Sequence, residues 1–122
     1  MSKNDLRKEL IECLIRVRKD LNLTDFILSH ELDTAANASQ NMLNHIAYVD
    51  LSNVDAVADK IGETILFAAF GDRRMDFTIV TKVFHFCHIA GQEIAHMMAV
   101  HCILSESKPS LFHSIKKVIK WL

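Results

Sequence analysis

Apolar side chains recur at intervals of three and four along most of the chain, which is the spacing that places them on one side of an α-helix. Over residues 3–21 this pattern predicts an amphipathic helix with its charged residues on the opposite side. Thr24 is the expected N-cap of a second helix. The polar residues Asn37–Asn41 allow a break in this helix at any of these positions. Ser52 or Asn53 is expected to begin the next helix, which again has one apolar side.

A different pattern follows the polar turn at residues 71–74. Asp76 or Thr78 can cap a helix start there, and an almost wholly apolar stretch follows in which Gly91 is the single Gly or Pro. A helix that is apolar nearly all round needs other helices around it. The sequence therefore predicts a central, buried helix over Thr78–Cys102.

Breaks in the chain are few, with three glycines and one proline in 122 residues. No segment alternates apolar and polar residues for long, so strands are not expected. Ser105–Pro109 is expected to separate the central helix from a last one, and Gly62 is small enough to allow two helices to approach closely. Residues 1–122 are thus predicted to form a single all-α domain, a compact bundle around the central helix.

Composition and charge exclude several classes of protein. The net charge of −1 offers no general attraction for nucleic acid. The three cysteines show no disulfide framework, which fits a reducing compartment. No apolar run reaches the ~18 residues of a membrane span. The sequence has no Gly-flanked serine and no Gly-rich phosphate loop, so neither an enzyme nor a cofactor is expected.

The second half of the chain resembles the Bcl-2 family of apoptosis regulators, in which a leucine-phenylalanine helix end, a glycine-containing acidic turn and an Asn-Trp-Gly-Arg motif precede the central helix. The residues that carry this resemblance are Leu66-Phe67, Gly71-Asp72, Asp76 to Ile79, the apolar run from Ile79 to Phe86, and Pro109 to Trp121, which is similar to the family's sixth helix. Leu28 to Asp33 looks like a degenerate Bcl-2 homology 3 motif. The family's last helices, second homology motif and membrane tail have no counterpart, so the chain resembles a minimal viral homologue from a large DNA virus.

The motif itself departs from the family. Phe77, Thr78 and Ile79 stand where the family has tryptophan, glycine and the arginine that pairs with the aspartate of a bound death-motif helix. Arg73 or Arg74 is the candidate replacement for that arginine, and the alternative is that both are solvated turn residues.

The resemblance implies an inhibitor of apoptosis that sequesters the homology 3 helices of pro-apoptotic family members. It also implies a place in the host cytoplasm, and at the mitochondrial surface through these partners. Such helices bind by placing apolar side chains into a surface groove. The expected groove residues are Met42, Ile46, Val57, Ile61, Ile65, Phe67, Phe70, Arg73, Arg74, Phe77, Val80 and Phe84. A place in the core is the competing interpretation for each apolar member of this set.

Other functions stay open at this point. His85, His88 and His96 share one stripe of the central helix and form an alternative metal site, although tetrahedral zinc would need a further ligand. A non-apoptotic helical adaptor is the second alternative. Apolar surface that the unmatched last helices would have covered also suggests a homodimer.

Overall fold

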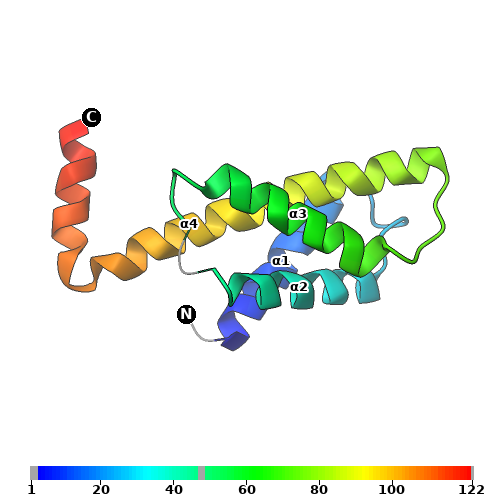
Figure 1. The fold of residues 1–122 in the computed structure, drawn as a ribbon, viewed down its shortest axis with the longest axis horizontal. Helices are drawn as coiled ribbons and strands as arrows, with labels where there is room; N and C mark the ends of the chain where they lie inside the picture. The colour runs from blue at the N-terminus through cyan, green and yellow to red at the C-terminus, as the bar shows by residue number, and fades with distance from the viewer. Residues whose placement is uncertain (1–2, 47–48, 122) are drawn as a thin grey trace.

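The protein is all-helical in the computed structural model, as the sequence predicts. The structure describes the backbone of residues 3–46 and 49–121 and the side chains of residues 4–46, 49–102 and 104. Its four helices are α1 (Lys3–Asp20), α2 (Ser29–Leu43), α3 (Val54–Phe70) and α4 (Phe77–Trp121), and no strand occurs in the described backbone (Figure 1). The helices pack against one another as one bundle.

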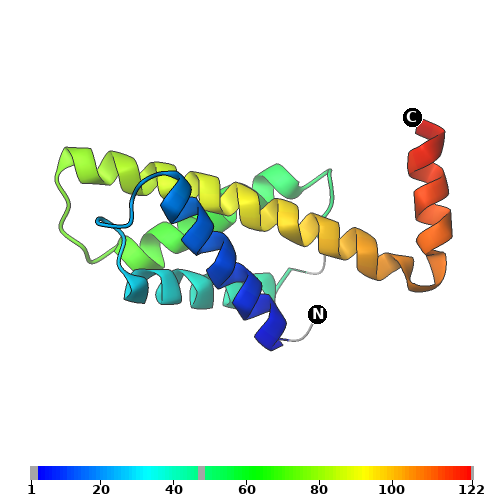
Figure 2. The ribbon, with the colours of Figure 1, turned by 180° about the vertical axis from the view of Figure 1, so that it is seen from behind.

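The four helices form a closed cycle of neighbours. α3 and α4 lie antiparallel and side by side, α2 packs on α3, and α1 crosses behind to contact both α2 and α4 (Figures 1 and 2). Among the described residues α2 makes no contact with α4. As a result, α4 has helices on only two of its sides.

The core lies in the space enclosed by this cycle. Its largest fully buried side chains are Phe70, Phe86, Leu10, Leu14, Ile27, Ile61, Ile65 and Ile94. Phe70 and Phe86 meet edge to face with ring centroids 6.3 Å apart, which joins the end of α3 to the middle of α4. Each helix therefore contributes its apolar side to one common core.

Two glycines set the distance between α3 and α4. A Cβ added at Gly91 would lie 2.3 Å from the Ala58 carbonyl oxygen, and one added at Gly62 would lie 3.0 Å from the Cys87 carbonyl oxygen. The backbones of the two helices therefore touch at this crossing, which only glycine permits. The predicted role of Gly62 in close helix approach is confirmed.

The starts of α3 and α4 are confirmed at the expected residues. Asn53 is the N-cap of α3, and Asp76 accepts a hydrogen bond of 2.9 Å from the Ile79 N–H at the start of α4. Asp76 thus satisfies one of the backbone donors that a helix start leaves without a partner.

The expected start of the second helix at Thr24 is wrong, because α2 begins five residues later. The Leu23 carbonyl instead accepts hydrogen bonds from the Phe26 and Ile27 N–H groups, closing a turn. The Leu28 N–H donates to Glu31 Oε1 at 2.9 Å, so the glutamate of a capping box fixes the helix start. Only the glutamate half of the box is present, because the N-cap residue Leu28 has no side-chain acceptor.

The two expected breaks do not end a helix. α2 is continuous through residues 37–41, and α4 continues as helix past Pro109 to Trp121. It changes direction sharply near this end, so that its last turns stand away from the bundle (Figures 1 and 2). A proline inside a helix removes one backbone hydrogen bond and favours such a kink.

The predicted enclosure of α4 is only partial. Phe84 is 52% exposed and Val100 55%, although both lie on the helix expected to be buried all round. The reason is that α1 and α3 are the described helices that cover α4, which leaves its other sides open. The uncovered apolar surface is the natural place to look for a partner.

Candidate functional site

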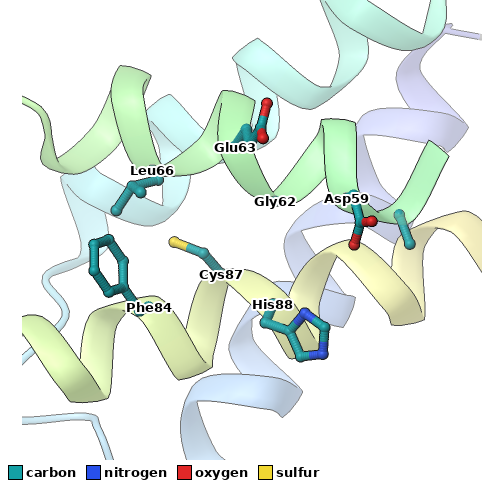
Figure 3. A pocket seen from close by; sticks show the side chains of 8 residues that line it. Asp59, Gly62, Glu63, Leu66, Phe84, Cys87 and His88 are labelled. Carbon is teal, nitrogen blue, oxygen red and sulfur yellow. The ribbon is translucent and has the colours of Figure 1, made fainter. Parts of the chain in front are cut away.

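A hollow of about 290 Å³ opens between α3 and α4 on the outer side of their crossing. Figure 3 shows Leu66 from α3 and Phe84 from α4 facing each other across it, with the Cys87 side chain between the two helices. The full lining is Ala58, Asp59, Gly62, Glu63, Leu66, Phe84, Cys87 and His88. Its size and open shape suit the side chains of another protein better than a small enclosed ligand.

The glycine crossing explains where this hollow lies. At Gly62 the two backbones are so close that no side chain fits between them. Leu66, one turn further along α3, and Phe84 on α4 therefore remain at the rim, where Phe84 is half exposed. The glycines that allow the two helices to approach closely thus leave an apolar rim beside the contact.

Exposed aromatic side chains extend this apolar rim toward the turn between α3 and α4. Phe77 lies two helical turns before Phe84, on the same side of α4. Phe67 follows Leu66 on α3 and is 74% exposed. We call Leu66, Phe67, Phe77 and Phe84 the α3/α4 surface. Three exposed phenylalanines on one helix pair are unusual for a protein surface that contacts only water.

Charged side chains lie at both ends of this region. Asp59 and Glu63 line the hollow at the end away from the turn. Arg74 is exposed and lies three residues before Phe77, at the turn end. Asp72 and Asp76 are also exposed beside Arg74, so the turn end carries both signs of charge.

Arg73 has a different place, within the fold. Its Nη1 donates to the Phe26 carbonyl oxygen and to Glu31 Oε1, the latter at 2.8 Å. The Glu31 side chain is only 4% exposed, and that of Arg73 is 27% exposed. The ion pair ties the turn after α3 to the start of α2, so of the two arginines only Arg74 faces solvent.

The other predicted groove residues divide between core and surface. Val57, Ile61, Ile65 and Phe70 are buried in the core. Met42 and Ile46 are partly buried against it, and the Thr64 hydroxyl lies 3.3 Å from the Met42 sulfur. Val80 is partly exposed. The structure therefore brings Phe84 to the hollow and Phe67 and Phe77 to its vicinity, and keeps the four core residues away from the surface.

Sequence reasoning missed most of the hollow's lining. Of its eight lining residues, only Phe84 belongs to the expected groove residues. The available signal was Gly62, because a glycine marks the point where two helices touch, and the hollow opens beside that contact.

The histidine stripe does not converge on one point. His88 lines the hollow beside α3, whereas His96 lines a separate hollow beside α1. His96 Nδ1 lies 2.6 Å from the Gln92 carbonyl oxygen, a contact that uses this nitrogen as a donor. Within the described part of the chain, no group of three or more His, Cys, Asp or Glu side chains is placed to hold a metal ion.

The buried cysteines are unreactive at neutral pH. Burial raises the pKa of the Cys87 thiol to about 12 and that of the Cys13 thiol to about 11. Because the thiolate is the reactive form, these side chains are poor nucleophiles at neutral pH. Cys87 therefore contributes apolar surface to the hollow rather than chemistry.

Comparison with known proteins identifies no relative. No protein-family model, no curated protein and no solved structure matches the chain. Among the described residues, no helix has the length and apolar character needed to cross a membrane. Fold and surface define an all-helical protein with an exposed apolar face on a pair of helices.

Proposed function

We propose that the protein is a Bcl-2-like inhibitor of apoptosis that binds the homology 3 helix of pro-apoptotic proteins on its α3/α4 surface. The observation that carries the proposal is the exposure of three phenylalanines beside an open hollow on one helix pair. An amphipathic helix buries its apolar side in such a surface, with side chains at intervals of three and four as anchors.

The exposed apolar area is large enough to supply a substantial part of the free energy of binding. Complete burial of a phenylalanine side chain contributes about 1.5–3 kcal/mol, and micromolar binding requires ~8 kcal/mol. Allowing for the part of each ring that is already buried, Phe67, Phe77 and Phe84 supply roughly half of that energy before the cost of association. Leu66 and the floor of the hollow add to it.

The charged residues offer positions for charged residues of the bound helix. An acidic residue of the partner is stabilised near Arg74, and a basic residue near Asp59 and Glu63. A homology 3 helix has the aspartate that this arrangement needs. Arg74 therefore takes the role of the family's motif arginine, which this chain lacks.

Calorimetric titration with peptides of about 26 residues that carry homology 3 motifs tests the proposal. We expect at least one peptide to bind with submicromolar Kd, and the paired peptide with its conserved leucine and aspartate replaced to show no binding. Replacing Phe84 by Ala should weaken the complex at least ~10-fold, because truncation of a central aromatic anchor costs 1–2 kcal/mol or more.

A matched control separates this surface from general apolar stickiness. Ile15 is 43% exposed and lies on α1, so Ile15→Ala removes exposed apolar area elsewhere and should leave Kd unchanged. Circular dichroism before titration establishes that both variants are folded. Binding that Phe84→Ala leaves intact, or no binding by any peptide, would contradict the proposal.

A further inference from the structure

The α3/α4 surface is uncovered in the single chain. The exposed fractions of Phe67, Phe77 and Phe84 are 74%, 86% and 52%. α2 contacts α3 and α1 contacts α4, yet neither helix covers these rings, and the last turns of α4 stand away from the bundle (Figures 1 and 2). No described part of the same chain therefore keeps the three rings from water.

The residues of this surface lie in two neighbouring rows, one on each helix. On α4, Phe77, Phe84 and His88 are seven and four residues apart, so they share one side of the helix. On α3, Glu63 lines the hollow together with His88, and Phe67 follows one turn later on the same side. Each row is therefore apolar near the turn and polar at its other end.

We propose that the α3/α4 surface binds a second copy of the chain, and that this dimer closes the surface until a partner helix displaces one copy. The dimer rests on the exposed phenylalanines alone, whereas its displacement by a homology 3 helix rests on the proposed function. In a dimer with two-fold symmetry the same patch of each copy forms the contact. The apolar rows of one copy thus cover those of the other.

The exposed area is close to what a stable dimer needs. An aromatic side chain buries about 150–250 Å² when it is fully covered, so at their exposed fractions the three phenylalanines of one copy offer roughly 300–500 Å². Two copies together bury roughly 600–1,000 Å² through these rings, and a specific interface needs about 1,000 Å². Leu66 and Val80, which are partly exposed, supply further area. We therefore expect a reversible dimer with a dissociation constant in the micromolar range.

The charges favour an antiparallel arrangement of the two α4 helices. If these helices ran in the same direction, Asp59 and Glu63 of the two copies would face each other, and like charges brought together weaken an interface. In the antiparallel arrangement these carboxylates lie beside the turn of the second copy, which carries Arg74 among charges of both signs. Phe77 of one copy then packs against Phe84 of the other.

Light scattering over a range of protein concentrations tests the dimer. We expect a mass of two chains at high micromolar concentration that falls toward one chain on dilution. Phe77→Asp places a charge in the apolar row of both copies and should raise the dissociation constant at least ~100-fold. Ile15→Asp places the same charge on α1, at a side chain that is 43% exposed, and should leave the mass at two chains. Circular dichroism establishes that both variants are folded.

Thr81 tests the symmetry of the contact. It is exposed and lies between Phe77 and Phe84, so the two copies of residue 81 meet near the axis of the antiparallel dimer. In a Cys102→Ser background, Thr81→Cys should therefore form a disulfide between two chains on mild oxidation. Thr34→Cys is the matched control on α2, because both threonines are exposed and both hydroxyls donate to the carbonyl four residues earlier. Equal cross-linking of the two variants, or none by Thr81→Cys, would overturn this arrangement.

Titration of the dimer with homology 3 peptides separates this proposal from the proposed function. We expect a binding peptide to reduce the mass from two chains to a complex of one chain and one peptide, with weaker apparent affinity at higher protein concentration. A mass of one chain at high micromolar concentration, with peptide binding intact, would overturn the dimer and leave the proposed function standing. A dimer that Phe77→Asp dissociates but that no peptide affects would support the shared contact and contradict the proposed function. A complex that keeps two chains with peptide bound would overturn the proposal that the two occupants share one surface.

Discussion

Arg73 and Arg74 are adjacent in sequence, yet the structure gives them different tasks. Replacement of Arg73 by Ala leaves the Glu31 carboxylate in a site where its side chain is only 4% exposed. One hydrogen bond to that carboxylate remains, from the Leu28 N–H at 2.9 Å, and the Phe26 carbonyl also loses a donor. A buried anion without its cation is therefore the main consequence.

The size of the effect follows from burial. Removing one partner of a fully buried ion pair costs about 3–5 kcal/mol. Because the Arg73 side chain is 27% exposed, water screens part of the interaction, and we expect Arg73→Ala to lower the unfolding free energy by about 2–3 kcal/mol. Arg74→Ala removes an exposed side chain and should change the unfolding free energy by less than about 0.5 kcal/mol.

Urea unfolding followed by circular dichroism measures both values. Glu31→Gln in the Arg73→Ala background removes the buried charge, so the double variant should recover part of the lost stability. Partner binding should show the reverse order, with Arg74→Ala reducing affinity for a peptide that carries the motif aspartate. Equal stability of the Arg73→Ala and Arg74→Ala variants would refute this assignment.

Three further predictions concern the helices themselves. Gly91→Ala should destabilise the fold by at least ~2 kcal/mol, because the new Cβ would meet backbone atoms at 2.3 and 2.9 Å, and this outweighs the better helix propensity of alanine. Gly62→Ala has a closest contact of 3.0 Å and should cost less in the same urea assay. Asp76→Ala should cost about 1 kcal/mol through loss of the cap, and Asp76→Asn should restore most of it. Burial raises the pKa of the Cys13 and Cys87 thiols from 9.0 to about 11 and about 12, so the unfolded state loses protons first as pH rises. Stability should therefore fall from about pH 9 upward by ~1.4 kcal/mol per pH unit for each thiol, and Cys87→Ala should roughly halve the slope attributable to the two groups.

The all-helical class and the starts of α1, α3 and α4 could be predicted from local sequence, since they depend on apolar spacing and on caps. Asp76 is an example, because a cap acts through its own next few residues. The start of α2 was misplaced because Thr24 and Glu31 are competing signals, and only the tertiary contact of Glu31 with Arg73 shows which one is used.

The candidate surface was harder to predict from the sequence than the helices were. The apolar pattern of α4 predicts how much of the helix avoids water, but the number of helices available to cover it depends on the whole arrangement. Phe84 and Ile94 look equivalent in sequence, yet one is half exposed and the other fully buried. Phe70 was among the expected groove residues, and its contact with Phe86 places it in the core instead.

The most direct test of the proposed partner surface is the map of amide chemical-shift changes when labelled protein is titrated with a homology 3 peptide. The account predicts changes concentrated at Leu66, Phe77 and Phe84 and around the hollow that they border. Changes centred on α1, or none at a saturating peptide concentration, would contradict it.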